Sequence, residues 1–386
     1  MPLNFALTQR FKVVSGAGTL ATLGEIITGA GYRKAFVLYD AGIRDTGIAD
    51  KVLAVLKNAG IEAVTYDKVL SDPPEYIVEE AAELCKSKGC DCVIAVGGGS
   101  TIDTGKGVTV LRFNPGHILD YAKPDAQMQY SPGLISIPTT SGTGAELSNG
   151  IIISNSKTGE KNPIVGYNAM SEYVILDPEL TTGMPKGLTA MTGLDAFSHA
   201  AESYTTVLTS PIVAPICEKV MQEIVEYLPR AMQNGQDLEA REHMLIASSL
   251  GGWLLSNCCA HVGHSLAHIL GGELHVPHGA ACAFTCPPAL RFIAPVVPAK
   301  VRKIGEILGA SFTGKETPEE IAAVTGAAYK KFRDEKVGMP PLSTFHVTKE
   351  AAVALAPKVV TECFAPLTPR AVTEEAAREM YEEMFK

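Results

Sequence analysis

Short runs of hydrophobic and β-branched residues alternate with amphipathic stretches along the first 180 residues of the chain. The apolar runs are K-A-F-V-L-Y-D, A-V-T-Y-D, C-V-I-A-V and G-L-I-S-I-P, and helical periodicity lies between them near residues 48–59 and 77–88. This alternation requires crossover connections, because consecutive strands are separated by helices. It predicts a mainly parallel β-sheet covered by helices.

After Asp195 the pattern changes to helical periodicity with almost no convincing strand. A segment rich in proline and glycine, residues 176–187, interrupts both patterns. We therefore expect an α/β domain over residues 1–187 and an all-helical domain over residues 188–386. The helical stretches of the second domain are expected near residues 211–234, 237–258, 298–309, 317–335, 348–361 and 373–385.

Composition narrows the class of protein. A chain of 386 residues exceeds the size at which one hydrophobic core keeps growing, which agrees with two domains. The formal net charge of -9 and the lack of a long Lys and Arg run argue against a nucleic-acid partner. The chain begins without a charged and then apolar signal, and no eighteen apolar residues are consecutive. The sequence thus predicts no membrane partner and a cytoplasmic location.

Nine cysteines in this chain are predicted to be free thiols in a reducing compartment. The spacings in Cys90-Asp-Cys92, Cys258-Cys259 and Cys282…Cys286 lack the paired C-x-x-C pattern of structural zinc sites. Most of these residues are interpreted as small buried hydrophobic groups, with a reactive thiol at Cys258 or Cys259 as the alternative.

Two glycine-containing loops follow predicted strands. In C-V-I-A-V-G-G-G-S-T-I-D-T-G-K-G, residues 97–99 precede a predicted helix whose unpaired N–H groups favour an anion. The loop lacks the Walker A pattern, because Gly107 follows Lys106, and it lacks G-x-G-x-x-G, because Ile102 takes the third glycine place. By itself it suits a phosphate site or a plain tight turn equally.

The second loop, I-P-T-T-S-G-T-G-A-E, adds the hydroxyls of Thr139, Thr140 and Thr143. Loops at the carboxyl ends of consecutive strands form the crevice where open α/β sheets bind nucleotides, so the pair predicts a pyrophosphate site. Asp40 ends a predicted strand, where its carboxylate would accept hydrogen bonds from ribose hydroxyls and repel a 2′-phosphate. This favours NAD over NADP, and the alternative for Asp40 is a helix or turn cap.

One carboxylate and four imidazoles in the second half of the chain have spacings that suit a metal site. Asp195 and His199 are four residues apart, as are His264 and His268, so each pair shares a helix face; His278 lies in a Pro-His-Gly turn. Carboxylate and imidazole donors suit Fe(II), Zn(II), Mn(II) or Co(II). The alternative for any single one of these residues is a satisfied buried or surface polar group.

These segments in this order resemble the iron-containing (group III) alcohol dehydrogenases from about Lys12 to the C-terminus. The matching parts are G-G-G-S at 97–100, P-T-T-S-G-T-G-A-E at 138–146, G-L-D-A-F-S-H-A-A-E at 193–202 and H-S-L-A-H…P-H-G at 264–279. The resemblance implies an N-terminal dinucleotide-binding domain, an all-helical metal-binding domain and a homodimer or larger homo-oligomer.

Matched residue by residue, the resemblance also implies a site. The metal, Fe(II) first and Zn(II) as the alternative, would be held by Asp195, His199, His264 and His278. His268 would be no ligand and would pass a proton to solvent near the nicotinamide. The NAD(H) contacts would come from Asp40, Gly97, Gly98, Gly99, Ser100, Thr139, Thr140, Thr143 and Lys161. Two departures from the usual family wording, Ser71-Asp72-Pro73 and G-A-E-L-S-N-G, make Asp72 and Asn149 further candidate contacts.

We therefore expect an NAD-dependent alcohol dehydrogenase or aldehyde reductase that transfers hydride between nicotinamide and a metal-bound small primary alcohol or aldehyde. Glu202 shares a helix face with Asp195 and His199 and would accept a hydrogen bond from a ligand. The alternatives are a maleylacetate-reductase-like enzyme, whose relatives tend to lack the full metal set, and a dehydroquinate-synthase-like enzyme, which needs several basic side chains. Residues 258–286 contain no Lys or Arg. A remote alternative is a non-catalytic nucleotide- or metal-binding protein.

Overall fold

The computed structural model describes residues 5–123 and 125–386 and divides them into two compact units. One unit is Thr8–Met184, and the other is Pro185–Lys386 together with residues 5–7. The division follows Met184, inside the segment rich in proline and glycine.

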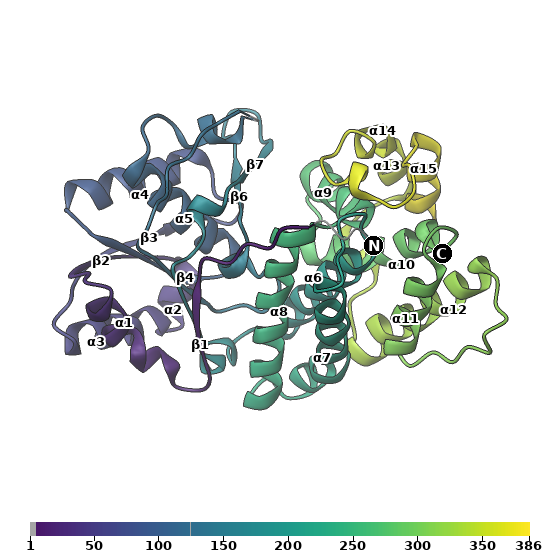
Figure 1. The fold of residues 1–386 in the computed structure, drawn as a ribbon, viewed down its shortest axis with the longest axis horizontal. Helices are drawn as coiled ribbons and strands as arrows, with labels where there is room; N and C mark the ends of the chain where they lie inside the picture. The colour runs from purple at the N-terminus through teal and green to yellow at the C-terminus, as the bar shows by residue number, and fades with distance from the viewer. Residues whose placement is uncertain (1–4, 124) are drawn as a thin grey trace. The chain divides into compact units, whose positions relative to one another are not determined.

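A parallel sheet forms the centre of the unit Thr8–Met184 (Figure 1). Its strands are all parallel, and β2 coincides with the predicted run K-A-F-V-L-Y-D. The predicted parallel sheet is confirmed, although the sequence did not reveal its strands β1 and β8, which are only four residues long. Among the described residues the sheet has six strands in the order β1 (Lys12–Ser15), β8 (Tyr173–Leu176), β5 (Leu134–Pro138), β4 (Cys92–Gly97), β2 (Lys34–Asp40) and β3 (Glu62–Val69).

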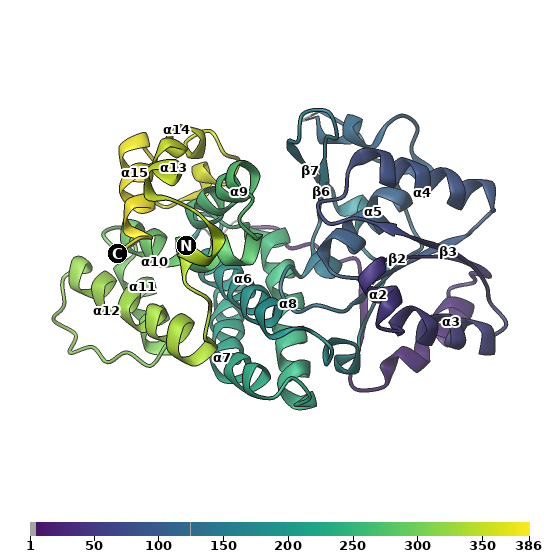
Figure 2. The same ribbon diagram turned by 180° about the vertical axis from the view of Figure 1, so that it is seen from behind.

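Helices cover both faces of this sheet because successive side chains of each strand point to opposite faces. Phe36 and Leu38 of β2 pack in one core with residues of α4 (Glu75–Ser87) and α5 (Gly99–Phe113). The alternate residues of β2 pack in a second core with α1 (Leu23–Gly29) and α3 (Ile48–Asn58). Figures 1 and 2 show α4 and α5 on one side of the strands and α1 and α3 on the other.

A hairpin that the sequence did not reveal, β6 (Gly150–Ser154) and β7 (Lys161–Val165), pairs in antiparallel fashion beside this sheet. The buried Lys106 of α5 holds its start, because Nζ donates to the carbonyl oxygens of Ser148 at 3.0 Å and Gly150 at 2.7 Å. The lysine of the glycine-rich segment therefore stabilises the fold from inside, in keeping with the absence of a Walker A pattern.

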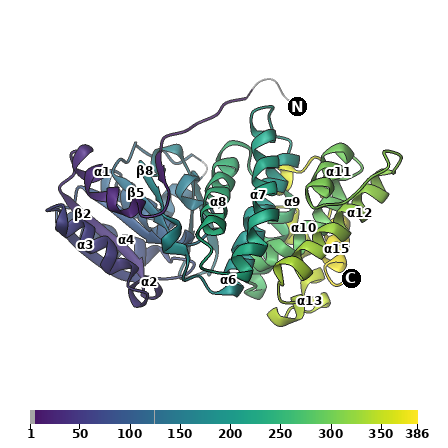
Figure 3. The same cartoon turned by 90° about the horizontal axis from the view of Figure 1, so that it is seen from below.

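The unit Pro185–Lys386 is helical, with no strand among its described residues, as predicted. Its helices α6, α7 and α8 pack against one another, and α10 packs against both α6 and α9 (Figures 1 and 3). The helices are α6 (Lys186–Thr205), α7 (Val213–Gln233), α8 (Leu238–Cys258), α9 (Val262–Leu274), α10 (His278–Ile293), α11 (Pro298–Ile307), α12 (Pro318–Lys331), α13 (Lys349–Ala354), α14 (Ala356–Val359) and α15 (Glu374–Glu383).

Two predicted helices are less regular than expected. The stretch near 317–335 is α12 followed by a π-helical turn at Phe332–Val337, and the stretch near 348–361 divides into α13 and α14. Within the described ranges, no single helix has the length and apolar character to cross a membrane; α8 and α9 meet that test only as a pair bent by 108°.

Candidate metal and nucleotide sites

Helices α6, α9 and α10 bring three of the four predicted metal ligands, Asp195, His264 and His278, into one tight group of donor atoms, and the fourth, His199, contacts this group through Asp195. Oδ1 of Asp195 lies 3.6 Å from Nε2 of His199 on the same helix, 3.8 Å from Nε2 of His264 on α9 and 3.3 Å from Nε2 of His278, the first residue of α10. The start of α10 can approach α6 this closely because the next residue is glycine. A Cβ at Gly279 would overlap the carbonyl oxygen of Met191 on α6.

The arrangement suits a divalent cation. Oδ1 of Asp195 is buried and has no hydrogen-bond partner among the described residues, which is costly for a carboxylate unless a cation is bound. Donors around a tetrahedral cation with bonds of about 2.0–2.2 Å lie about 3.4 Å apart, close to the distances from Oδ1 to the three imidazole nitrogens. These residues thus fit the divalent metal that the sequence predicted.

Electrostatics keep the donors in the forms that bind cations. Burial lowers the pKa of His199 to about 4 and, with the help of the neighbouring His278, lowers that of His264 to about 3. Burial alone would raise the pKa of Asp195, but His199 and His278 lower it well below its usual range. At neutral pH Asp195 is therefore a carboxylate, and His199 and His264 are neutral imidazoles.

Glu202, one helical turn or two beyond the ligands of α6, has the expected hydrogen bond to a predicted ligand. Nδ1 of His264 lies 2.6 Å from Oε1 of Glu202, and Oε2 accepts the backbone N–H groups of His261 at 2.8 Å and His264 at 3.2 Å. Because the carboxylate accepts, Nδ1 of His264 carries the proton and Nε2 keeps its lone pair toward Asp195. Burial raises the pKa of Glu202.

His268 lies one turn beyond His264 and is bound by a residue that sequence reasoning missed. Its Nδ1 lies 2.8 Å from Oε1 of Glu362, whose Oε2 accepts from Oγ of Ser265 at 2.6 Å. Although burial raises the pKa of Glu362, the hydrogen bonds from His268 and Ser265 lower it to about 2. The ring of His268 stacks on that of His278 with 5.3 Å between centroids. No sequence signal pointed to Glu362, which is 94 residues away.

Cys282 is the second residue that the sequence interpretation missed. All nine cysteines are free thiols, as predicted. The interpretation of Cys282 as only a small buried hydrophobic group was incomplete, because its sulfur lies 3.8 Å from Nε2 of His264 and 3.6 Å from Nε2 of His278. A signal was available: Cys282 follows His278 at the four-residue spacing that singled out Asp195 and His199.

The two predicted phosphate loops touch each other at the carboxyl ends of β4 and β5, which pair in parallel from Val93 to Gly97. The backbone N–H of Thr139 donates to the carbonyl of Gly97 at 3.0 Å. A Cβ at Gly98 would lie 3.3 Å from Oγ1 of Thr140, and a Cβ at Gly99 would lie 2.9 Å from Oγ1 of Thr143. Glycine therefore lets the threonine loop cover the start of α5.

Asp40 lies at the end of β2 and caps α2 (Ala41–Asp45), since Oδ1 accepts from the N–H of Ile43 at 2.9 Å. The helix cap named as its alternative role is therefore present. Its other oxygen, Oδ2, lies 3.5 Å from Oγ1 of Thr101 in the first turn of α5.

The remaining candidate cofactor residues lie in the same unit. Nζ of Lys161 contacts Oδ1 of Asp72 at 2.6 Å, and the N–H of Asp72 donates to Oγ of Ser100 at 3.2 Å. The carbonyl of Asn149, just before β6, accepts the N–H of Gly166. The predicted cofactor residues thus all belong to Thr8–Met184, and the predicted metal residues and His268 all belong to Pro185–Lys386.

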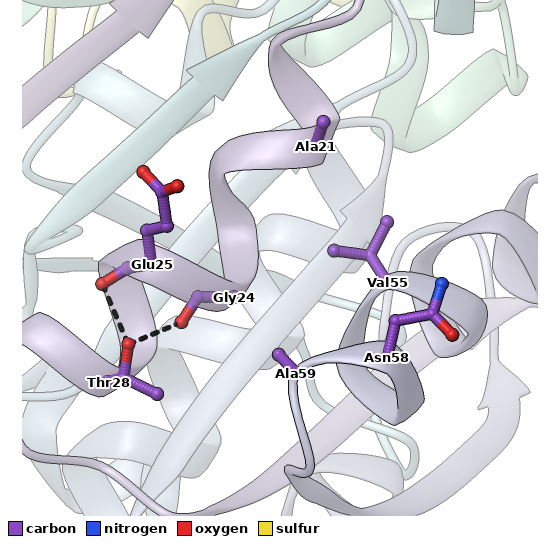
Figure 4. A pocket seen from close by; sticks show the side chains of 7 residues that line it. All are labelled: Ala21, Gly24, Glu25, Thr28, Val55, Asn58 and Ala59. Carbon is purple, nitrogen blue, oxygen red and sulfur yellow. Dashed lines mark hydrogen bonds between the residues drawn. The ribbon is translucent and has the colours of Figure 1, made fainter.

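A surface hollow between α1 and α3 lies apart from this chemistry (Figure 4). Its lining is mostly small, with Glu25 as the one carboxylate drawn, and Thr28 donates to the carbonyls of Gly24 and Glu25. Its lining includes none of the predicted site residues.

Comparison with known proteins matches both halves of the chain. The model of the family described as "Iron-containing alcohol dehydrogenase" matches residues 11–178. The model of the family described as "Fe-containing alcohol dehydrogenase family, C-terminal" matches residues 189–385. A choline dehydrogenase of Bacillus subtilis (strain 168) is 34% identical over 374 residues, which are 96% of this chain and 92% of that protein.

Other similar proteins are also named as dehydrogenases of alcohols. An NAD-dependent methanol dehydrogenase of Bacillus methanolicus is 32% identical over 304 residues, 79% of this chain and 80% of that protein. The solved structure of an alcohol dehydrogenase from Oenococcus oeni is 30% identical, with a TM-score of 0.93 over 99% of this chain and 100% of that chain. The chain therefore belongs to the iron-containing alcohol dehydrogenase family, whose reaction is NAD-dependent alcohol dehydrogenation with iron or another divalent metal.

Proposed function

We propose that this enzyme interconverts small primary alcohols and aldehydes at a metal held by Asp195, His199, His264 and His278. The observation that supports this most is the buried, unpartnered Oδ1 of Asp195 with three imidazole nitrogens at 3.3 to 3.8 Å. We assign NAD(H) binding to residues 1–187 and metal binding to residues 188–386. The relatives' named reactions favour this over the lyase and the non-catalytic alternatives.

When bound, the cation supplies a Lewis acid for the alcohol or aldehyde oxygen, and NAD(H) supplies the hydride acceptor or donor. The chain's own residues bind and orient the cofactor and the substrate. The loops at residues 97–100 and 139–143 offer backbone N–H groups and hydroxyls to the pyrophosphate, with the first turn of α5 behind them. Asp40 accepts from the ribose, while Asp72, Asn149 and Lys161 complete the cofactor contacts.

His268 moves the proton in this proposal. Glu362 accepts from its Nδ1, so Nε2 is the atom that exchanges a proton with the substrate and solvent. The side chain of His268 is 34% exposed, which gives the ring access to water; of the proposed ligands, His199 and His264 are buried and His278 is 36% exposed. Glu362 fixes the tautomer and is a positioning residue.

The substrate in this proposal is small and uncharged at the reacting end. The ring of Phe364 lies with its centroid 5.5 Å from that of His268 and 6.3 Å from that of His264, which supplies an apolar wall beside the site. Residues 258–286 contain no Lys or Arg, so this segment offers no cationic side chain to an anionic substrate. The relatives are named for choline and for methanol, so a substrate panel has to include a cation as well as neutral alcohols.

We further propose a cytoplasmic enzyme that forms a homodimer or a larger homo-oligomer. The nine free thiols support a reducing compartment. The oligomeric state would be measured by sedimentation velocity; a monomer at micromolar concentration would contradict it.

The decisive experiment uses anaerobically purified protein of known metal content, with and without added Fe(II). NADH oxidation would be followed with short neutral aldehydes, betaine aldehyde and anionic aldehydes, and substrates would be ranked by kcat/KM. We expect metal-dependent turnover of neutral aldehydes. If the fully metallated enzyme oxidised NADH with none of these aldehydes, the proposal would be contradicted.

Three variants test the assigned roles. His264→Ala should lose both bound metal and activity, whereas His268→Ala should keep the metal and slow turnover. Glu362→Gln should resemble a mild His268→Ala, with metal retained and kcat reduced by less than the about 10²–10⁴-fold of a lost general acid or base. Equal metal loss in His264→Ala and His268→Ala would contradict the assignment of His264 as a metal ligand and of His268 as a proton carrier that does not bind the metal.

A further inference from the structure

Four donor atoms from α6, α9 and α10 form a tight group that includes a sulfur. One ligand atom from each of Asp195, His264, His278 and Cys282 lies within 4.8 Å of the other three. Cys282 is 1% exposed, and it follows His278 by one helical turn on α10. Its sulfur therefore faces the two imidazole nitrogens that the proposed metal site uses.

The distances match coordination by sulfur. Bonds of about 2.3 Å to sulfur and about 2.1 Å to nitrogen that meet at an angle of roughly 100–110° place the two donors about 3.4–3.6 Å apart. The sulfur of Cys282 lies 3.6 Å from Nε2 of His278 and 3.8 Å from Nε2 of His264. Oδ1 of Asp195, which belongs to the same group, is buried without a well-formed hydrogen bond among the described residues, and a cation at the centre of the group would satisfy it.

Cys286 is a second buried cysteine of α10 and serves as a comparison for Cys282. It lies one turn further along α10 and is 2% exposed, as sealed as Cys282. Among the described residues, the cysteine sulfur that contacts Nε2 of His264 and Nε2 of His278 is that of Cys282 and not that of Cys286. Burial in α10 therefore does not by itself bring a sulfur to the imidazoles, and the position of Cys282 is specific.

We propose that Cys282 binds the metal through its sulfur, in addition to Asp195, His199, His264 and His278. On binding, the thiol gives its proton to solvent and a sulfur–metal bond forms, with no change in oxidation state. The inference rests on the proposed metal site and deepens it. Because thiolate is a soft donor, the site should favour Zn(II) and Co(II) over Fe(II) more strongly than a site built from carboxylate and imidazole alone.

Cobalt is the probe that tests this, because its spectrum separates metal binding from sulfur binding. The anaerobic protein would be loaded with Co(II), and visible d–d absorption would report cobalt in the site. A near-ultraviolet charge-transfer band would report a sulfur–cobalt bond. We expect both bands in the wild-type enzyme and in the control Cys286→Ala. Cys282→Ser and Cys282→Ala should keep the d–d bands and lose the charge-transfer band.

Metal selectivity gives a second readout. In competition between Zn(II) and Fe(II), Cys282→Ser should shift the affinity ratio toward Fe(II) by about tenfold or more, since even a lost supporting contact costs about 10–100-fold in metal affinity. Cys286→Ala should leave the ratio unchanged.

The outcomes separate the two proposals. Stoichiometric cobalt with d–d bands but no charge-transfer band in the wild type overturns the role of Cys282 and leaves the metal site. Failure of the wild type to bind cobalt overturns both. A charge-transfer band that persists in Cys282→Ser assigns the sulfur to another cysteine and also overturns the inference. If the Cys282 variants do not fold, X-ray absorption of the wild-type cobalt protein decides: sulfur at about 2.3 Å is expected, and its absence overturns the inference.

Discussion

Replacing Glu202 with glutamine tests how the fold orients a metal ligand. The carboxylate accepts three hydrogen bonds: the backbone N–H of His261 at 2.8 Å, the backbone N–H of His264 at 3.2 Å and Nδ1 of His264 at 2.6 Å. Glutamine has the same shape but presents one oxygen and one NH₂ group to these three donors. Either the two backbone N–H groups or Nδ1 of His264 must therefore face the NH₂ group in place of an oxygen.

The structure indicates which side changes. If the NH₂ group replaces Oε2, two buried backbone donors lose their acceptor, at about 1–3 kcal/mol each. If it replaces Oε1, His264 can switch tautomer so that Nδ1 accepts, which keeps every hydrogen bond but places a proton on Nε2. The second choice costs less, about 1 kcal/mol of stability, and removes the lone pair that faces Asp195. We therefore expect a loss of metal affinity of about 10–100-fold with only a small loss of stability.

The assay pairs urea denaturation of the metal-free protein with competition titration of the metal. Ser203→Ala is the matched control: it lies next to Glu202 on α6 and loses one hydrogen bond, from Oγ to the carbonyl of Cys259 at 3.0 Å, without contact to a predicted ligand. It should cost about 1 kcal/mol and leave metal affinity unchanged. Gly263→Ala should act like Glu202→Gln, because its Cβ would lie 2.5 Å from Oε1 of Glu202. Wild-type metal affinity in a folded Glu202→Gln protein would refute the reasoning.

Three other experiments probe the cofactor loops and the charge state of the metal-free site. Asp40→Asn should keep the cap of α2 and raise the ratio of NADP to NAD use, while Asp40→Ala should also lower the free energy of unfolding by about 1 kcal/mol; an unchanged kcat/KM ratio for the two cofactors in both variants would leave Asp40 as a cap alone. Gly99→Ala should weaken NADH binding in a fluorescence titration and leave metal content intact, because its Cβ would lie 2.9 Å from Oγ1 of Thr143; full affinity would argue against a cofactor role for the two loops. The metal-free protein should lose stability as pH falls from about 6.5 toward 4, since unfolded histidines bind protons near pKa 6.5 while burial keeps His199 neutral to about 4 and His264 to about 3. Each contributes up to about 1.4 kcal/mol per pH unit, and urea midpoints that stay constant over this range would contradict it.

Local patterns in the sequence determined much of the fold. The run K-A-F-V-L-Y-D is long and apolar enough to specify a buried strand, and it coincides with β2. The periodicity near 237–258 likewise matches α8 (Leu238–Cys258). The four-residue spacing from Asp195 to His199 placed both side chains on one face of α6. These predictions succeed because side-chain periods of two and 3.6 residues are properties of the local backbone.

Contacts between distant segments were decided only by the tertiary structure. The strands β1 and β8 carry too few residues for a periodic signal, yet they pair with each other across about 160 residues of chain. Glu362 reaches His268 from 94 residues away, and its loop has no pattern of its own. The spacing from His278 to Cys282 was visible in the sequence, but only the packing of α10 against α6 and α9 turned that sulfur toward the imidazoles. Sequence thus determined which residue types are available on each helix face, whereas packing in three dimensions decided which of them meet, because a donor's direction depends on how whole helices cross.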